Sequence, residues 1–392
     1  MSEEAGRPSP LRFHPFLRQF LPGYLDRTGT GLLPRQREVF QKILRCRTPA
    51  LGGELYGCDP CQKFHYRYHS CNDRHCPQCG TTDTQQWLAH QQRLLVSATY
   101  FLFTFTVPKA LRAWIYSHPK LGYDLLFAAT SQALQDLAQD PNRLGGQLGM
   151  MGVLHTWSRT LIFHPHIHYL IPGGALSADG LSWIPARNNY LLSARALGMR
   201  TRTLFQELLA KEAPELLHLI PRKVWRQHWI VHGKATGAGD KTLIYLARYI
   251  FKTAATNRLL TFLPDGRVLW PYKDNDNRKW RAVKFHPDEL IRRFAQHVLP
   301  QGYCRVRCFG WLHPAAKGRL NRIRALLKQA PLLNAREQAD WKLPDELLPE
   351  DPPSPTPPAP MPVCPHCQKP MRFMADWFAG EKVPGPHQPR PP

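Results

Sequence analysis

The segment from His164 to Gly174 constrains the fold of this chain more than any other stretch of it. Its sequence, His-Pro-His-Ile-His-Tyr-Leu-Ile-Pro-Gly-Gly, is an apolar and β-branched run closed by a glycine turn, which predicts a short strand. Side chains alternate along a strand, so we expect His166 and His168 on one face and Ile167 on the other. Two imidazoles on one face can bind a divalent ion, although two half-buried histidines on an amphipathic strand give the same pattern.

A third imidazole, that of His155, lies upstream in the strand-like sequence 153–157. If residues 158–165 connect two antiparallel strands, His155 can lie beside the other two histidines. The run 100–107 predicts a core strand, and helical spacing follows over roughly 109–139. This order of strand, helix, strand and strand predicts an α+β fold, in which helices pack on an antiparallel sheet and the histidines lie on a central strand.

Two Cys-x-x-Cys knuckles, fourteen residues apart, precede this region. They consist of Cys58, Cys61, Cys76 and Cys79. Two knuckles at this separation predict one structural zinc site with four thiolate ligands. Cys71 and His75 lie between them and are additional or alternative ligands. Disulfides would be unusual in a reducing cytoplasm, where thiols stay free or bind metal.

A further knuckle, formed by Cys364 and Cys367, lies in Pro-rich sequence that begins near Pro344. Such sequence predicts an extended linker or a disordered tail. The knuckle could complete a second zinc site together with Cys304 and Cys308, or it could bind no metal.

The charge of the chain indicates its partner. The 392 residues include 52 Lys and Arg against 29 Asp and Glu, a formal net charge of +23. This excess favours a polyanion, and nucleic acid is the expected one. No apolar run reaches roughly the 18 residues of a membrane span, and no secretion signal is visible at the N-terminus. We therefore expect a cytoplasmic protein without a membrane partner.

A tyrosine pair lies in residues 241–252, where the apolar spacing is helical and Asp240 is a plausible N-cap. Tyr245 and Tyr249 are four positions apart, so both hydroxyls would project from one helix face. Arg248 and Lys252 flank them and could hold phosphates or favour the phenolate. Such a pair in isolation more often serves packing. Together with three histidines in a basic protein, it favours tyrosine attack on a DNA phosphodiester beside a metal ion.

These features together resemble those of a known group of enzymes. The pair His166 and His168 with the two tyrosines resembles the His-hydrophobic-His (HUH) endonucleases. Over most of its length, the chain is similar to the two-tyrosine rolling-circle transposases of the IS91 group. The segments that carry this resemblance are 70–79, 164–168 with 172–174, 245–249, 292–294 with 297–300, 305–307 and 309–312.

The resemblance implies roles for particular residues. His166 and His168 would bind a catalytic Mg²⁺ or Mn²⁺ ion with His155 as third ligand, whereas histidine ligands by themselves would equally suit zinc or nickel. Tyr245 and Tyr249 would be the nucleophiles. Arg305 and Arg307 alternate on a predicted strand, so both guanidiniums could bind phosphate from one face, or the pair could form a solvated edge.

The resemblance also implies three regions. These are a zinc-binding domain at 1–98, an HUH two-tyrosine catalytic domain at 99–330, and a Pro-rich tail with a lone knuckle at 331–392. The implied function is metal-dependent cleavage and transfer of single DNA strands through 5′-phosphotyrosine links. The substrates would be the single-stranded ends of a mobile element and target DNA, in a bacterial cytoplasm and on the nucleoid during the reaction.

Three other functions fit part of the pattern. A rolling-circle replication initiator would use the same chemistry. A non-catalytic zinc-containing DNA-binding protein would leave the histidines and tyrosines unexplained. A metal phosphohydrolase would need no tyrosine and would release free phosphate ends.

Overall fold

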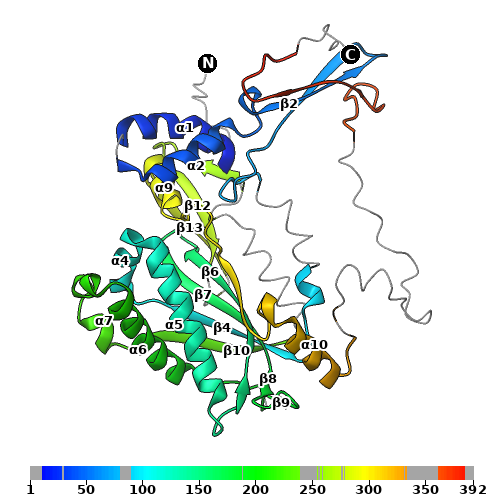
Figure 1. Ribbon diagram of the computed structural model, residues 1–392. Helices are drawn as coiled ribbons and strands as arrows, with labels where there is room; N and C mark the ends of the chain where they lie inside the picture. Colours follow the sequence, from blue (N-terminus) through cyan, green and yellow to red (C-terminus); the bar gives the residue numbers. More distant parts are fainter. Residues whose placement is uncertain are drawn as a thin grey trace.

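The structure is a computed structural model of the 392-residue chain. It describes residues 11–28, 31–79, 90–187, 189–238, 254, 257, 259–274, 277, 279–330, 332 and 361–384. The fold combines helices with four sheets, and all of their strand pairs are antiparallel. The predicted α+β class is therefore confirmed. Figure 1 shows a large sheet with its helices in the lower part of the molecule and two smaller units above it.

The large sheet has five strands in the order β10-β4-β7-β6-β14, so β7 is central. Their bounds are β10 (Ile230–Ala238), β4 (Thr99–Thr106), β7 (Phe163–Pro172), β6 (Gly149–Trp157) and β14 (Val306–Gly310). The predicted strands 100–107, 153–157 and 164–174 correspond to β4, β6 and β7. Residues 158–162 form the connection between antiparallel β6 and β7.

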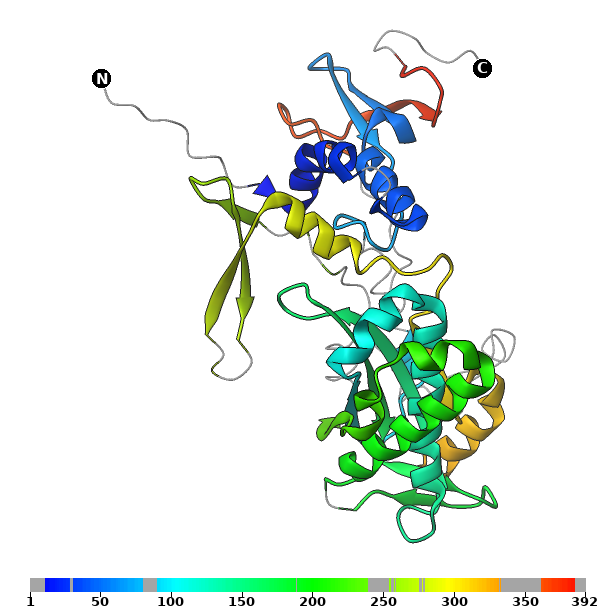
Figure 2. The ribbon, with the colours of Figure 1, turned by 90° about the vertical axis from the view of Figure 1, so that its left-hand side faces the viewer.

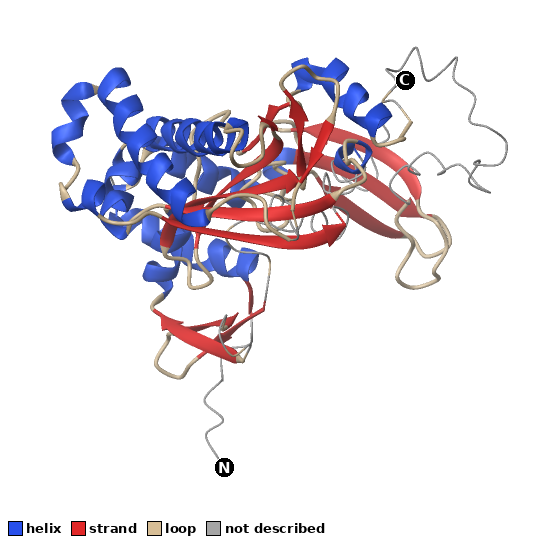
Figure 3. Cartoon of the chain, turned by 90° about the horizontal axis from the view of Figure 1, so that it is seen from below, coloured by secondary structure: helices blue, strands red, loops and turns tan. Residues whose placement is uncertain are grey.

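Helices cover one face of this sheet (Figures 1 and 3). They are α4 (Arg112–Ser117), α5 (Pro119–Gln139), α6 (Ala194–Glu212) and the short α7 (Lys223–Arg226). Phe105, Ile167 and Tyr169 point from the sheet into the core shared with these helices. Alternate strand residues, including Val153 and Leu170, pack on the opposite face in a core that includes residues of α10 (Lys317–Leu326). Both faces are thus covered, which explains why β6 and β7 are nearly continuous apolar sequence.

The second unit is built around the N-terminal helices. It contains α1 (Phe13–Thr28), α2 (Pro34–Arg45), α9 (Pro287–Ala295) and a sheet of β1 (Leu11–Arg12), β11 (Leu259–Phe262), β12 (Val268–Lys273) and β13 (Trp280–Phe285). Figure 2 shows the β12–β13 hairpin extending away from α9. The core joins Phe13 and Phe40 to Trp270 and Phe294. Residues 259–295 therefore fold with the N-terminal helices, across the domain boundary expected at residue 98.

The third unit is a sheet of β2 (Gly52–Cys58), β3 (Lys63–Tyr68) and β15 (Arg372–Phe378). The C-terminal strand β15 pairs antiparallel with β2, from Arg372 opposite Gly57 to Phe378 opposite Gly52 (Figure 1). Part of the expected tail is thus folded, because Ala375 and Trp377 share one strand face and pack with Leu55 of β2. The Pro-rich stretch 333–360 lies outside the described residues.

The remaining elements are short. A small sheet consists of β5 (Gly146–Gln147), which precedes β6, and of β8 (Gly174–Ser177) and β9 (Trp183–Pro185), which follow β7 in the chain. The 3₁₀ helices are η2 (Pro49–Leu51), η3 (Lys109–Leu111), η4 (Pro214–Leu219) and η5 (Pro314–Ala316). In the part of the chain that the structure describes, no helix has the length and apolar character needed to cross a membrane.

Candidate metal sites

The structure brings His155, His166 and His168 together on the large sheet. His155 of β6 is the register partner of His166 of β7, and His168 is the partner of Thr104 of β4. The ring centroids of the three histidines are 4.7 to 5.3 Å apart. One ring nitrogen from each lies within 4.8 Å of the others. The residues are therefore close enough to share one metal ion.

Neighbouring groups fix the orientation of two of these rings. The Nδ1 of His166 lies 2.6 Å from the carbonyl oxygen of His164, which can only accept, so this nitrogen carries the proton. The Nδ1 of His168 lies 2.8 Å from the hydroxyl of Thr104. In each case this contact holds the ring through Nδ1. This is the usual arrangement of a metal-binding histidine, whose second nitrogen is held by a hydrogen bond.

Burial keeps the three imidazoles neutral. It lowers the pKa of His166 to about 4 and that of His168 to about 3. Burial, together with the nearby His168, His166 and Arg305, lowers the pKa of His155 well below its ordinary value. Neutral imidazole is the form that binds metal. A donor set of imidazoles without a carboxylate suits a transition-metal ion better than Mg²⁺. The three residues thus fit a divalent transition-metal ion.

A basic cleft lies at the start of β7, the strand that carries His166 and His168. It is lined by Arg112 and Tyr116 of α4, Arg292 and Arg293 of α9, and residues 162–163 at the start of β7. The Nε of Arg112 is buried and has no hydrogen-bond partner among the described residues. Burial lowers the pKa of Arg112, and this arginine in turn contributes to the lowered pKa of His164 and His166. Burying a cation that has no partner costs free energy unless a bound anion neutralises the charge.

The structure gives Arg305 and Arg307 different surroundings. The guanidinium of Arg307 forms an ion pair of 2.5 Å with Asp124 of α5 and lies over the rings of Phe127 and Tyr303. Arg305 is half-buried near His155, and burial together with Arg74 lowers its pKa to about 10. Within the described residues, no carboxylate pairs with Arg305. Of the two, Arg305 is the one that lies near His155 without an ion pair among the described residues.

The predicted tyrosine pair and its basic neighbours lie outside the described part of the chain. Tyr245, Arg248, Tyr249 and Lys252 all lie in the stretch 239–253, outside the described residues. The described residues on either side are anchored separately. Ala238 pairs with Thr99 at the end of the sheet furthest from His166. Further on, the side-chain oxygen of Asn257 accepts a hydrogen bond from the backbone N–H of His14 in α1.

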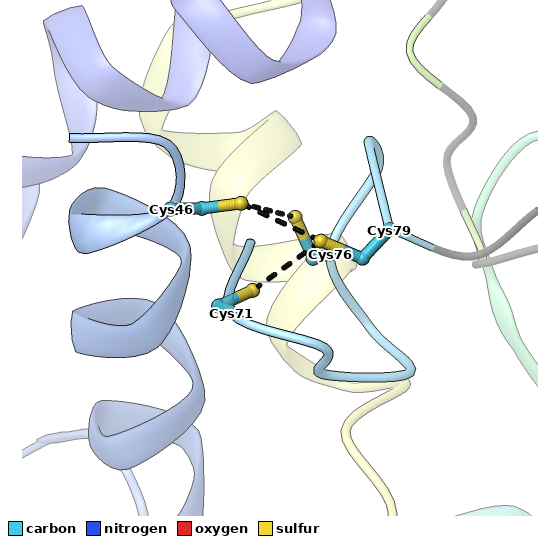
Figure 4. A group of neighbouring side chains, drawn as sticks. All are labelled: Cys46, Cys71, Cys76 and Cys79. Atoms are coloured by element: carbon cyan, nitrogen blue, oxygen red, sulfur yellow. Dashed lines mark hydrogen bonds between the residues drawn. The ribbon is translucent and has the colours of Figure 1, made fainter. Parts of the chain in front are cut away.

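Four cysteines converge at the end of α2 (Figure 4). They are Cys46, Cys71, Cys76 and Cys79. The sulfur of Cys46 lies 3.5 Å from that of Cys79 and 3.7 Å from that of Cys76, and the Cys71 and Cys79 sulfurs are 3.7 Å apart. Sulfurs bound at the usual distance to a tetrahedral zinc ion are about 3.8 Å from one another. The thiols are free, and the group fits a structural zinc ion.

The predicted grouping of the knuckles is corrected by this arrangement. The structure divides Cys58, Cys61, Cys76 and Cys79 between two clusters, and the first two lie with Cys364 and Cys367. The reason is the β2–β3 hairpin: Cys58 and Cys61 form its turn, and β3 then runs away from them. Six strand residues span roughly 20 Å, so the segment 71–79 begins at the other end of the hairpin.

The two alternative ligands, Cys71 and His75, have different surroundings. Cys71 joins the first cluster, whereas His75 is occupied elsewhere: its Nδ1 donates to Asp73 (2.8 Å) and its Nε2 accepts from the backbone N–H of Leu299 (3.1 Å). Cys304 and Cys308, in and before β14, belong to neither cluster. Sequence reasoning missed Cys46, an isolated cysteine without a knuckle, whose only signal is its position directly after the last residue of α2.

Comparisons with known proteins match both parts of the chain. The family model described as "Putative transposase" matches residues 149–319, which include all three histidines. The model described as "Transposase zinc-binding domain" matches residues 16–107, which include the first cysteine cluster. Cys364 and Cys367 lie outside both matches.

Two relatives extend these matches. The "Putative transposase y4qJ" of Sinorhizobium fredii is 38% identical over 303 residues, covering 72% of this chain and 76% of the relative. The transposase for insertion sequence element IS801 of Pseudomonas savastanoi pv. phaseolicola is 29% identical over 302 residues, covering 72% of this chain and 71% of the relative. No solved structure matches the chain.

The fold, the cysteine cluster and these matches define a transposase with an N-terminal zinc-binding domain. The chain belongs to the family of IS91-like transposases. Membership of this family implies a DNA-processing enzyme whose substrate is DNA.

Proposed function

We propose that the chain cuts and rejoins single-stranded DNA by metal-dependent HUH chemistry, with Tyr245 and Tyr249 as nucleophiles. The observation that carries this proposal is the convergence of His155, His166 and His168, whose ring nitrogens lie within 4.8 Å of one another on the large sheet. Neutral imidazoles gathered this closely support metal binding. A divalent ion held there would withdraw charge from a non-bridging oxygen of the scissile phosphate.

The tyrosines would perform the transfer. The Oη of one tyrosine forms a bond to phosphorus, the bond from phosphorus to the 3′ oxygen breaks, and this oxygen leaves with the electron pair and takes up a proton. The products are a 5′-phosphotyrosine and a free 3′ hydroxyl. Because the bond energy is conserved, the hydroxyl of another strand can reverse the step and be joined. A second tyrosine allows one end to stay bound while another strand is cut.

Arginines near the histidines would hold the DNA backbone. Arg112 lines the basic cleft with an unpartnered Nε, and Arg305 is half-buried beside His155 without a carboxylate partner among the described residues. Guanidinium groups bind phosphate oxygens through paired hydrogen bonds. The two arginines therefore support a strand path that passes through the cleft and across the metal site.

A covalent-trapping assay tests this function. The protein is incubated with Mn²⁺ and labelled single-stranded DNA from the ends of its mobile element, and the products are separated on a denaturing gel. We expect a shifted, covalent band that requires the metal ion and is lost in His166→Ala. His218→Ala, which changes an exposed histidine of η4, is the matched control and should retain the band.

The other outcomes distinguish the alternatives. Binding of DNA without any adduct, in folded and metal-loaded protein, would indicate a non-catalytic DNA-binding protein. Cleavage with free phosphate ends and no adduct would indicate a phosphohydrolase. An adduct formed only at a plasmid or phage origin would indicate a replication initiator.

A further inference from the structure

The turns at Cys58 and Cys364 have the same sequence pattern. Residues 58–63 read Cys-Asp-Pro-Cys-Gln-Lys and residues 364–369 read Cys-Pro-His-Cys-Gln-Lys. In both, the Gln that follows the second cysteine adopts a positive φ, 50° at Gln62 and 58° at Gln368. Asn and Gly are the usual residues in this conformation, so its appearance at both glutamines indicates that the two turns share one local structure.

The backbone of each knuckle closes in the same way. Cys58 is the register partner of Lys63 at the end of the β2–β3 hairpin. The backbone N–H of Cys364 donates to the carbonyl oxygen of Lys369 at 2.9 Å. The two segments are thus equivalent hairpin turns, each presenting two sulfurs.

These two turns face each other although they are far apart in sequence. Cys58 and Cys367 are 309 positions apart, and their sulfurs lie 3.5 Å from each other. One sulfur from each of the four cysteines lies within 4.8 Å of the others. An ion pair of 3.2 Å between Asp59 and Arg372 also joins the two segments. Free thiols at this spacing match a tetrahedral zinc site and not a disulfide, whose sulfurs are about 2 Å apart.

The sheet that carries these turns has little else to stabilise it. On the side of the knuckles its core contains Tyr56 and Met371 besides the four cysteines. The other side buries Leu55, Ala375 and Trp377. A three-stranded sheet with so small a core usually requires a metal ion or disulfides to remain folded. The cysteines are free, which leaves a metal ion.

We propose that Cys58, Cys61, Cys364 and Cys367 bind a second structural zinc ion, separate from the one at Cys46, Cys71, Cys76 and Cys79. Zinc binding at this site releases the thiol protons and joins the C-terminal segment 361–384 to the β2–β3 hairpin. The C-terminal segment is then a permanent part of the N-terminal zinc module. This site does not involve the histidines and holds whether or not the proposed tyrosine chemistry is correct.

Zinc content of the full-length protein tests the proposal. Metal is measured by mass spectrometry in the wild type, in Cys364→Ser/Cys367→Ser and in Cys304→Ser/Cys308→Ser. We expect the first variant to hold about one zinc ion fewer than the wild type, and the second, which changes cysteines outside both clusters, to hold as much as the wild type. The difference between variants is the readout, so zinc bound at the histidines does not affect it. Equal zinc in all three proteins would overturn the proposal, as would loss of zinc from the Cys304/Cys308 variant alone.

A second measurement needs no variant. The zinc-loaded wild type is treated with an alkylating reagent and the labelled cysteines are mapped by mass spectrometry. The exposed Cys304 should react at once, and Cys364 and Cys367 should react only after a chelator is added, together with Cys58 and Cys61. Reaction of Cys367 at the rate of Cys304 in the zinc-loaded protein would contradict the site.

Discussion

His155 and His166 face each other directly across β6 and β7, with ring centroids 5.3 Å apart and ring planes nearly perpendicular. The register of this strand pair therefore sets the geometry of the metal site. A register shift follows His155 in β6, and the pairing resumes with Trp157 opposite Phe163. Bulges of this kind are common beside active sites, where they direct a side chain. Thr156 in this bulge is held by His297, whose Nδ1 lies 3.3 Å from its hydroxyl.

Thr104→Val should weaken metal binding without removing a ligand. The hydroxyl of Thr104 holds the Nδ1 of His168, and loss of such an outer partner typically lowers metal affinity by about 10- to 100-fold. Titration of the purified protein with Mn²⁺ in a calorimeter measures the change. Thr106→Val, on the same strand and opposite His166, is the matched control. Equal Mn²⁺ affinity in the wild type and Thr104→Val would show that the Thr104 hydroxyl does not support a metal ligand at His168.

Arg112→Gln and Arg305→Gln should each weaken binding of single-stranded DNA. If each arginine neutralises one phosphate, the slope of log affinity against log salt should become shallower by about 0.7 per substitution. Fluorescence anisotropy at several salt concentrations gives this slope. Arg143→Gln, an exposed arginine paired with its neighbour Asp140, should leave the slope unchanged. An unchanged slope in both test variants would remove the proposed strand path.

Phe294→Ala should unfold the N-terminal unit more readily. The Phe294 ring is buried against Phe13 of α1 and Phe40 of α2, with centroids 5.3 and 6.0 Å away. Removing a buried aromatic ring costs about 3–5 kcal/mol of unfolding free energy. Leu259→Ala, an exposed side chain of β11 in the same unit, should cost far less. Urea unfolding measures both, and similar stability of the two variants would mean that α9 does not pack against the N-terminal helices.

The ion pairs of Glu289 should stabilise the fold at neutral pH and lose this effect at acidic pH. Hydrogen bonds from Arg292 and Arg293 lower the pKa of Glu289 to about 2, against an ordinary value of 4.5. Since the folded pKa is the lower one, the ion pairs stabilise the fold above about pH 4.5, and this contribution disappears as the pH falls toward 2. Its size is below about 1 kcal/mol, because the pairs are partly exposed.

Urea unfolding of the wild type and of Glu289→Gln at several pH values tests the direction of this pH dependence. The wild type should be the more stable protein at neutral pH, and the two curves should converge as the pH falls below the ordinary glutamate value. Glu215→Gln, an exposed carboxylate of η4, is the control. A difference that grew on acidification would mean that the pKa of Glu289 is raised and not lowered.

Local sequence pattern predicted the elements that hold the histidines. The apolar and β-branched run that ends at the glycine turn corresponds to β7. Alternation also placed His166 and His168 on one face, because this follows from strand geometry alone. His155 could be placed beside them because the connection from β6 to β7 is short.

Long-range pairing was not predictable from local pattern. The two knuckles that are adjacent in the sequence were expected to share one zinc ion, but the β2–β3 hairpin separates them. The first knuckle instead lies with Cys364 and Cys367, which β15 brings to the β2–β3 sheet. Cys46 carries no local signal, since it stands alone after a helix. Arg305 and Arg307 were expected on one strand face, yet β14 begins at Val306, so Arg305 precedes the strand and need not follow its alternation.

The most direct test of the central claim maps the covalent adduct to a residue. The protein is trapped on single-stranded DNA with Mn²⁺, digested with nuclease and trypsin, and analysed by mass spectrometry. Trypsin cleaves after Lys241, Arg248 and Lys252, so Tyr245 and Tyr249 fall in separate peptides. We predict a nucleotide on Tyr245, on Tyr249, or on both in different molecules, and no adduct in the double Phe variant. A nucleotide found only on a peptide without either tyrosine, or an adduct that persists in the double variant, would contradict the account.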